Sequence, residues 1–324
     1  MTFPLRLVAA VGLAALLPLS AMAEEAYPQK PVTIVVPQSP GSVTDIVARA
    51  ISGPLSKALG QPVVIDNRNG ASGIIGAERV ARAKPDGYTL FVGSVSTHGL
   101  NSGIFKTLPY DPLKDFAPIT QITDSPLVIA VSPESKIRTL NELIARAKAE
   151  PGKLTFASAG NGSGSRFTGE LLKASAGIDL THVPYRGPAE AVAAVVGGEA
   201  TLAIPSAPST PTFIKSGRLV PLAVTGATRT DLLPDVPTTA ELGHPSVAFT
   251  SWTALFAPAG TPEPIVQQLY RTTKAVLAEP EVRKALSDVG ASPVGSTPDE
   301  LRVFVESQVA TWTKAARDAN ISEN

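Results

Sequence analysis

The fold of this chain is decided by one stretch of its sequence, Thr33-Ile-Val-Val-Pro-Gln-Ser-Pro-Gly-Ser-Val43. Its first four residues are β-branched and predict a buried strand, which Pro37 ends. A helical pattern follows from Val43 to about Leu59, and Gly53-Pro54 is expected to kink or break that helix because proline lacks the backbone donor. A strand, a Gly/Ser loop and a helix in this order are the repeating unit of an α/β protein.

The same alternation continues along the chain. Leu154 to Ala157 predicts a strand, Gly160-Asn-Gly-Ser-Gly-Ser165 a loop, and Phe167 to Ser175 a helix. Two further helix starts are indicated by the capping boxes Thr139-Leu-Asn-Glu142 and Thr297-Pro-Asp-Glu300. Further strands are expected at Pro62 to Ile65, Tyr88 to Val92 and Leu127 to Val131, and further helices ending near Val80 and from Thr261-Pro262 to about Ala278. We find no internal repeat and no low-complexity linker, so a boundary between domains has to come from segments that cross between two cores.

Composition excludes several classes of protein. The 324 residues include no cysteine, which rules out a disulfide framework, thiolate metal sites and cysteine nucleophiles. Lys and Arg total 28, Asp and Glu total 28, and 17% of the residues are charged. The chain therefore offers no basic field for a nucleic acid. With 30 Pro and 26 Gly, it is expected to be a globular protein with many turns.

The N-terminus has the three regions of a signal peptide. Arg6 is the only charge before Glu24, an apolar run covers Leu7 to Leu17, and Ala21-Met-Ala23 is a small-x-small cleavage site. The apolar run is too short to span a bilayer, and no cysteine follows the cleavage site to carry a lipid. A buried N-terminal helix is the alternative. We expect residues 1–23 to be removed and the product to be a soluble periplasmic protein.

The residues give little support to catalysis. The histidines His98, His182 and His244 are too far apart for a helical metal pair, and HExxH, G-x-S-x-G and the phosphate-binding P-loop motif are all missing. Gly160-x-Gly162 opens like a dinucleotide fingerprint, but Ser165 stands where the third glycine is needed. No cofactor and no metal are expected. The alternative is an exported serine hydrolase that would pair Ser163 or Ser165 with His182.

A binding function has better support. The segments 36–43 and 157–167 are both strand–loop–helix junctions, where the first N–H groups of the helix have no internal partner. Together with the helix dipole these groups form a site for an anion. Glycine allows close approach to the backbone, and Ser42, Ser163 and Ser165 add hydroxyl donors. The alternative is that both junctions are simple tight turns.

Several motifs, in order over nearly the whole mature chain, carry a family resemblance. They are Tyr27-Pro-Gln-Lys-Pro31, Asp66-Asn-Arg68 with Gly70, Gly73 and Gly76, Lys84-Pro-Asp-Gly-Tyr-Thr-Leu90, Ser96-Thr-His98, Leu108-Pro-Tyr-Asp-Pro112 with Asp115-Phe116, His182-Val-Pro-Tyr-Arg-Gly187, Leu222-Ala-Val-Thr225, Leu233-Pro-Asp-Val-Pro-Thr238 and Ala257-Pro-Ala-Gly-Thr-Pro262. From Tyr27 to about Ile321 the chain resembles the Bug-type solute receptors of tripartite tricarboxylate transporters.

The resemblance implies a two-lobed, type II-like periplasmic binding protein with a mixed sheet and flanking helices in each lobe. One lobe would hold residues 24–124 and 245–324, and the other residues 125–244. A small mono-, di- or aromatic carboxylate would bind in the cleft, and the partners would be this ligand and the membrane subunits of the transporter. A membrane sensor is an alternative recipient, and a monomer is the default state for a receptor that closes on its ligand. The ligand-binding residues that the resemblance implies are Gly41, Ser42, Val43, Asp45, Ser94, Ser96, Thr97, Asn161, Gly162, Ser163, Gly164, Ser165, Arg166, Tyr185 and Arg186.

Asp45, which the resemblance places in the site, would repel an anion, so it is expected to order the loop or a bridging water, or simply to cap the helix.

Other positions depart from the family pattern. Family members usually carry a glycine at Ser42 and a His-Leu pair at Arg166-Phe167. If its side chain faces the cleft, Arg166 would bind a second carboxylate of the ligand. If the side chain faces solvent, Arg166 gives no information about the ligand. An acidic residue is frequent around Ile204-Pro-Ser206. Its absence here disfavours ligands with an ammonium group.

Overall fold

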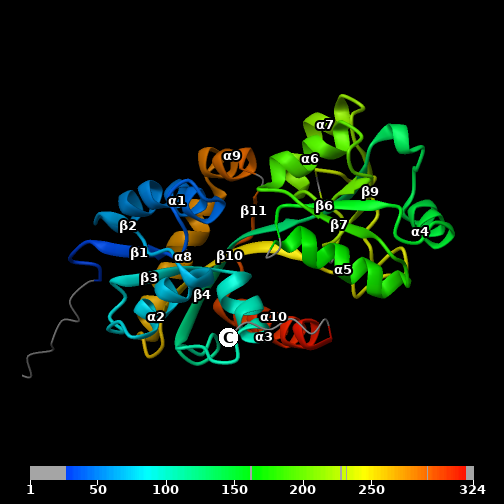
Figure 1. Cartoon of the computed structure of the whole chain (residues 1–324). Helices are drawn as coiled ribbons and strands as arrows, with labels where there is room; N and C mark the ends of the chain where they lie inside the picture. Colours follow the sequence, from blue (N-terminus) through cyan, green and yellow to red (C-terminus); the bar gives the residue numbers. More distant parts are fainter. Residues whose placement is uncertain (1–26, 161–162, 227, 231, 290, 319–324) are drawn as a thin grey trace, which may run out of the picture.

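A computed structural model describes residues 27–160, 163–226, 228–230, 232–289 and 291–318. The predicted signal peptide, residues 1–23, lies outside the described residues. The chain forms two mixed β-sheets, each flanked by helices, so the predicted two-lobed α/β fold is confirmed (Figure 1). In the described residues, no helix combines the length and the apolar character that crossing a membrane would need.

The first sheet has the strand order β11-β4-β10-β3-β1-β2. Its strands are β1 (Val32–Val36), β2 (Val63–Asn67), β3 (Thr89–Ser94), β4 (Phe116–Pro126), β10 (Thr250–Pro258) and β11 (Ser292–Pro293). β1 pairs in parallel with β2 and β3, whereas β10 runs antiparallel to both β3 and β4. The carboxyl ends of β1 and β3 therefore meet at one edge, which is where ligands bind in open α/β sheets.

Helices cover both faces of this sheet because alternate strand residues point to opposite sides. They are α1 (Val43–Leu59), α2 (Ile74–Ala81), α3 (Asn101–Ile104), α8 (Glu263–Ala278), α9 (Pro280–Asp288) and α10 (Pro298–Asp318). Ile34 packs in the core that α1, α8 and α9 complete, whereas its neighbour Val35 packs in the core shared with α2 and α10. Both positions are fully buried, which explains the uninterrupted β-branched run.

The second sheet has the order β7-β6-β8-β5-β9. Its strands are β5 (Val128–Val131), β6 (Thr155–Ser158), β7 (Thr181–Pro184), β8 (Leu202–Ala203) and β9 (Val220–Val224). Its helices are α4 (Leu140–Ala149), α5 (Gly164–Ala176), α6 (Pro188–Val196) and α7 (Pro211–Lys215). α4 and α5 pack on one face and α6 on the other. Shorter helical turns lie at Ala71–Gly73, Ser96–Leu100, Pro133–Ser135 and Ala207–Ser209.

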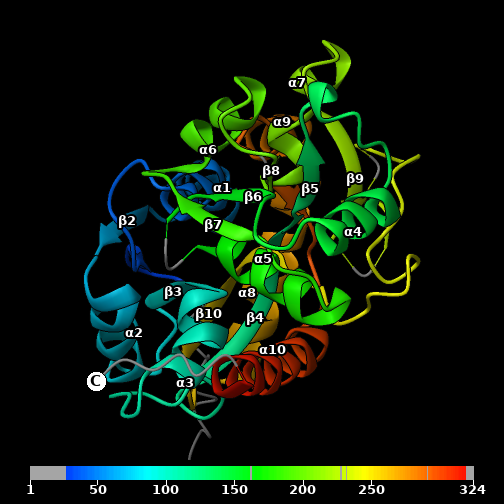
Figure 2. The ribbon, with the colours of Figure 1, turned by 45° about the vertical axis from the view of Figure 1, so that its right-hand side comes forward.

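Two connections join the sheets and meet at Thr225. β4 leads into β5 through Leu127, and the chain after β9 returns to β10 through Phe249. The fully buried Thr225 hydroxyl accepts a hydrogen bond from Leu127 N–H (2.8 Å) and donates one to the carbonyl oxygen of Phe249. Figure 2 shows α10 beside α5, where Trp312 packs edge-on against Phe167, with ring centroids 5.8 Å apart. The lobe boundaries at residues 124 and 245 stay a prediction.

Two helices refine the predicted pattern. α1 spans Val43–Leu59 as predicted and continues through Pro54 without a break, while the alternative effect of Gly53-Pro54, a kink, stays a prediction. Its residues Ile51 and Leu55 are buried against the sheet on either side of the proline, and this tertiary packing outweighs the missing hydrogen bond. α5 starts at Gly164 rather than at Phe167, because Ser163 caps it. The first turn of α5 is therefore made from residues that the sequence places in a loop.

Candidate ligand-binding site

The N-terminus of α1 presents unpaired backbone donors. Ser42 is the N-cap, and its hydroxyl oxygen accepts a hydrogen bond from the backbone N–H of Asp45 (3.3 Å). The N–H groups of Val43 and Thr44, which come before Asp45, have no acceptor among the described residues. Two donors at the positive end of a helix of 17 residues are thus left for a ligand or for water.

The N-terminus of α5 is built in the same way. Ser163 is the N-cap, and its hydroxyl oxygen accepts from the N–H of Arg166 (3.3 Å). The N–H groups of Gly164 and Ser165 have no acceptor among the described residues. A side chain at position 164 would collide with the ring of Phe249, since a Cβ there would lie 2.3 Å from that ring. Glycine therefore lets the start of α5 pack directly on Phe249.

Both helix N-termini open into one cavity of about 440 Å³, within the range of small-ligand sites. Val43 and Thr44 of α1 line it together with Gly164 and Ser165 of α5, which brings the two sets of donors to a single space. The complete lining is Gln38, Val43, Thr44, Ser94, Val95, Ser96, Leu100, Thr123, Ser125, Leu127, Ala159, Ser163, Gly164, Ser165, Pro188, Ile204, Pro205, Ser206, Phe249, Ser251, Trp252, Thr253, Val289 and Ala291. The pairing of the two junctions that the sequence predicted is thus present in the fold.

Four hydroxyl side chains from β4 and β10 form the floor of this cavity. Thr123 lies directly opposite Thr253 in the antiparallel ladder, and Ser125 lies directly opposite Ser251. Because residues two apart on a strand share a face, all four hydroxyls are on the same side of the sheet. The hydroxyl oxygens of Thr123 and Thr253 are 2.7 Å apart and share a hydrogen bond. We call these four residues the hydroxyl floor.

The described lining combines hydroxyl and apolar side chains and carries no charge. Ten of the residues named above are serine or threonine, and among the described lining residues none is Asp, Glu, Lys, Arg or His. The hydroxyl of Ser94, at the end of β3, is buried and has no hydrogen-bond partner within the described part of the chain. A buried hydroxyl without a partner is unfavourable by about 1–3 kcal/mol, which a ligand can relieve. Ser94 is therefore suited to contact a bound molecule.

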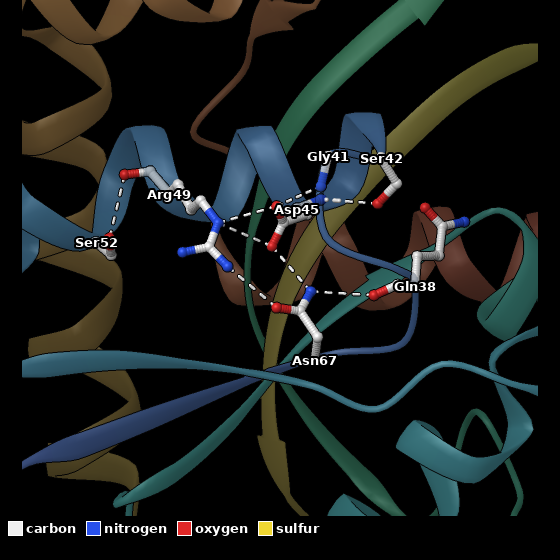
Figure 3. A network of polar contacts seen from close by, with 7 residues as sticks. All are labelled: Gln38, Gly41, Ser42, Asp45, Arg49, Ser52 and Asn67. Atoms are coloured by element: carbon white, nitrogen blue, oxygen red, sulfur yellow. Dashed lines mark hydrogen bonds and ion pairs between the residues drawn. The ribbon is translucent and has the colours of Figure 1, made fainter.

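Asp45 lies behind the N-terminus of α1 and not in the cavity (Figure 3). Its carboxylate accepts hydrogen bonds from Gly41 N–H (2.8 Å), from Asn67 Nδ2 (2.8 Å) and from Arg49 Nε (2.9 Å). Burial alone would raise the pKa of this carboxyl, but the hydrogen bonds from Arg49, Gly41 and Asn67 hold the pKa below its usual value. Asn67 also donates to the carbonyl of Gln38 (3.0 Å), so this network orders the loop before α1.

The other predicted site residues are divided. Those that line the cavity are Val43, Ser94, Ser96, Ser163, Gly164 and Ser165. Those that do not line it are Gly41, Ser42, Asp45, Thr97, Arg166, Tyr185 and Arg186. Asn161 and Gly162 lie outside the described residues. Their assignment to ligand binding stays a prediction.

Local contacts explain why four of these side chains stay outside the cavity. The Thr97 hydroxyl accepts from Ser94 N–H (3.0 Å) beneath the β3 loop, and Tyr185 packs against the core beside α6. Nε of Arg166 lies 3.9 Å from Oε1 of Glu170, one turn further along α5. The side chain of Arg186 is 90% exposed and pairs with Glu190 at 2.7 Å.

The serine and histidine of the hydrolase alternative are not paired. His182 Nε2 lies 2.7 Å from the hydroxyl of Ser158, which is fully buried at the end of β6. The hydroxyls of Ser163 and Ser165 instead lie 2.9 Å from each other, and Ser163 also donates to the carbonyl of Gly160 (2.7 Å). Burial and the charge of Arg166 lower the pKa of His182, while Glu170 acts in the opposite direction. No cluster of metal-ligating side chains occurs in the described ranges.

The hydroxyl floor is the part of the cavity that sequence reasoning missed. Its signal is present as Thr123-Asp-Ser125 and Ser251-Trp-Thr253, where hydroxyl residues stand two positions apart in each strand. Neither segment follows a strand–loop–helix junction, so the pattern that indicates helix N-termini does not indicate these residues.

Other cavities lie away from the N-termini of α1 and α5. One of about 440 Å³ opens at the far end of β4 and β10, where Glu263, Asp299 and Arg302 stand at its edge. Another, of about 660 Å³, is lined by Asp124 and Arg283. The first also contains the starts of two helices, α8 at Glu263 and α10 at Pro298, but Glu263 and Asp299 place carboxylates there that would repel an anion. The cavity between α1 and α5 carries no such charge among its described lining residues and is the best candidate site.

Known proteins resemble this chain over nearly its whole length. Residues 47–321 match TctC, described as the tripartite tricarboxylate transporter family receptor. Protein BugT of Bordetella pertussis is 36% identical over 312 residues, which cover 96% of this chain and 94% of BugT. A solved structure described as a periplasmic transporter is 40% identical with a TM-score of 0.74, over 92% of this chain and 99% of the other. Rpa4515 of R. palustris, solved with adipate, is 36% identical with a TM-score of 0.74, over 92% of this chain and 100% of its own.

Proposed function

This chain belongs to the tripartite tricarboxylate transporter receptor family, and from that premise we propose that it captures a small organic carboxylate between α1 and α5 and delivers it to a transporter of this type. The family consists of solute-binding receptors and not of enzymes, so the hydrolase alternative is set aside. Adipate in the related Rpa4515 is a carboxylate, which supports the same ligand class here.

The observation that carries the proposal is the convergence of two helix N-termini on one uncharged cavity. Val43 and Thr44 on one side and Gly164 and Ser165 on the other leave N–H groups without acceptors in the described chain. A hydrogen bond to a charged acceptor contributes about 1.5–3 kcal/mol net. Four such bonds sum to about 6–12 kcal/mol before the entropy lost on binding, and micromolar affinity corresponds to about 8 kcal/mol. Burial of the ligand and the Ser94 hydroxyl would have to offset that entropy.

The two sets of donors come from different sheets, so a ligand that contacts both would draw the lobes together. α1 follows β1 of the first sheet, and α5 follows β6 of the second. In this proposal the carboxylate bridges the two helix starts, the lobes close over it, and the transporter recognises the closed form. Thr225 and the β4 and β10 strands join the lobes at the base of the cavity and would act as the hinge.

Thermal unfolding of the mature protein, residues 24–324, against a panel of carboxylates and the methyl esters of the same acids tests this function. A ligand present at about 1,000 times its dissociation constant stabilises the folded state by about 4 kcal/mol and raises the midpoint by several degrees. We expect at least one acid to raise the midpoint while its ester does not. Equal shifts with acid and ester would contradict carboxylate recognition, and the absence of any shift would contradict the function.

A further inference from the structure

We propose that the hydroxyl floor, formed by Thr123, Ser125, Ser251 and Thr253, is a subsite that selects the distal end of the ligand. This subsite takes a neutral group that carries a hydroxyl, so the receptor prefers hydroxylated monocarboxylates to dicarboxylates and amino acids. The inference rests on the proposed function, because the ligand carboxylate is assigned to the starts of α1 and α5.

The hydrogen bond between Thr123 and Thr253 leaves one of their two hydroxyl hydrogens available. Thr123 and Thr253 each carry one hydroxyl hydrogen, and their 2.7 Å contact uses only one of the two. The second hydrogen and the remaining lone pairs are free to bond a group in the cavity. Thr123 and Thr253 are 2% and 5% exposed, so such a bond would form away from bulk water. A ligand hydroxyl, which both donates and accepts, matches this pair.

A second carboxylate at the floor would lack a counter-charge. No described lining residue is Lys, Arg or His. Arg166 directly follows the lining residue Ser165 in the chain but does not itself line the cavity. Its Nε lies 3.9 Å from Oε1 of Glu170. Taking a charged group out of water without a partner costs several kcal/mol, whereas a hydroxyl costs far less and is compensated by hydrogen bonds. The floor therefore disfavours a dicarboxylate.

An ammonium group lacks a partner for the same reason. No described lining residue is Asp or Glu, and the side of the cavity at Ile204, Pro205 and Ser206 offers no carboxylate. Asp124 stands between Thr123 and Ser125 in β4, but alternation turns its side chain to the opposite face, where it lines another cavity. An amino acid would bury its positive charge against hydroxyls alone.

Isothermal titration of the mature protein with matched six-carbon acids tests the subsite. The probes are hexanoate, its ω-hydroxy derivative, its ω-amino derivative and adipate, with the four-carbon series from butyrate to succinate run in parallel. We expect the ω-hydroxy acid to bind about three- to tenfold more tightly than the alkyl acid, as one or two hydrogen bonds provide, and more tightly than the dicarboxylate and the amino acid.

Variants connect this preference to the floor. Thr253→Val removes a hydroxyl with little change of shape and should weaken the ω-hydroxy acid about three- to tenfold while leaving the alkyl acid unchanged. Ser251→Ala, at an exposed position, serves as a second variant in case the buried one fails to fold. Thr33→Val is the matched control, since Thr33 lies in β1 of the same sheet and does not line the cavity.

Three outcomes decide between the hypotheses. Tighter binding of the dicarboxylate than of the ω-hydroxy acid in both series would overturn the inference and leave the proposed function intact. Equal losses for the alkyl and ω-hydroxy acids in Thr253→Val and Ser251→Ala would also overturn it. Failure of every acid in the wider panel to bind would overturn the proposed function and the inference with it.

Discussion

The backbone N–H of Gly41 donates a hydrogen bond of 2.8 Å to Oδ2 of Asp45, four residues further along the chain. Gly41 has φ of +82°, in the left-handed region that side chains disfavour, and the bond holds the chain in this turn. The same carboxylate accepts from Asn67 and Arg49. Asp45 thus shapes the entry to α1, and its charged side chain does not line the cavity.

Replacing Asp45 by asparagine should destabilise the protein in a pH-dependent way. The pKa of Asp45 is below its unfolded value, about 3.9, so its contribution is fully present above that pH and is lost as pH falls through the lower folded pKa. We expect Asp45→Asn to lower the free energy of unfolding by about 1–3 kcal/mol at neutral pH, and the difference from wild type to shrink below about pH 4. Urea unfolding of wild type and Asp45→Asn at neutral pH and below about pH 4 measures the difference in the free energy of unfolding.

Asp299→Asn is the control for that experiment, since the Asp299 side chain is 87% exposed. Exposed ion pairs contribute little, so this variant should match wild type within about 0.5 kcal/mol. A difference between Asp45→Asn and wild type that does not change with pH would show that the charge of Asp45 has no part in the network.

Replacing Val43 by proline should remove one ligand-binding donor without disturbing α1. Proline is tolerated at the first position of a helix, and Ser42 already has φ −67° and ψ 160°, the extended conformation that a residue before proline requires. We expect the affinity for the carboxylate to fall about tenfold or more, as one lost hydrogen bond to a charged group implies. Titration calorimetry on Val43→Pro and Val43→Ala separates the effects of the backbone and the side chain. Unchanged affinity in the proline variant would exclude this N–H from the site.

Replacing Thr225 by valine should weaken the junction between the two sheets. The variant leaves the buried N–H of Leu127 and the carbonyl of Phe249 without the hydroxyl that both now contact. Two buried groups without partners are expected to lower the free energy of unfolding by about 2–4 kcal/mol. Thr225→Ser keeps the hydroxyl and should retain most of the stability. Chemical denaturation of both variants makes the comparison, and equal stabilities would show that the hydroxyl is unimportant.

His98 should make the protein acid-sensitive. Its ring is fully buried, stacks on Phe256 with centroids 4.1 Å apart, and contacts Thr97 through Nδ1. Burial lowers the pKa of His98 to about 3. Because the unfolded pKa is about 6.5, the free energy of unfolding should decrease by up to about 1.4 kcal/mol per pH unit as pH falls from 6.5 towards 3. For His98→Phe, the free energy of unfolding should depend less steeply on pH across this range, by about one proton taken up on unfolding. The same pH dependence in the variant and the wild type would refute the lowered pKa of His98.

Much of the fold could be predicted because local and tertiary preferences agree. The reciprocal bonds of Thr297 and Glu300 follow from the capping box alone. At Glu142 the prediction holds in part, since its N–H bonds Thr139 as expected while its carboxylate accepts from the N–H of Arg138. The bounds of α1 follow from local sequence, whereas its continuation through Pro54 does not, because the burial of Ile51 and Leu55 depends on a sheet that local sequence does not reveal.

The candidate site could be predicted only where it is local. Ser163 and Gly164 stand in a loop–helix junction that the sequence displays, and both line the cavity. Ser125 and Ser251 are 126 positions apart and become neighbours only through the β4–β10 register. No spacing rule along the chain connects them, so predicting the hydroxyl floor requires knowledge of which strands pair and in which register.

The uncharged cavity also determines how the receptor responds to its surroundings. Attraction between full charges weakens as ionic strength rises, whereas hydrogen bonds made at contact distance inside a closed site are screened much less. With no titratable side chain among the described lining residues, the protonation of the ligand itself governs how affinity varies with acidity. If the proposed site binds a carboxylate, its affinity would therefore stay nearly constant in dilute and saline media.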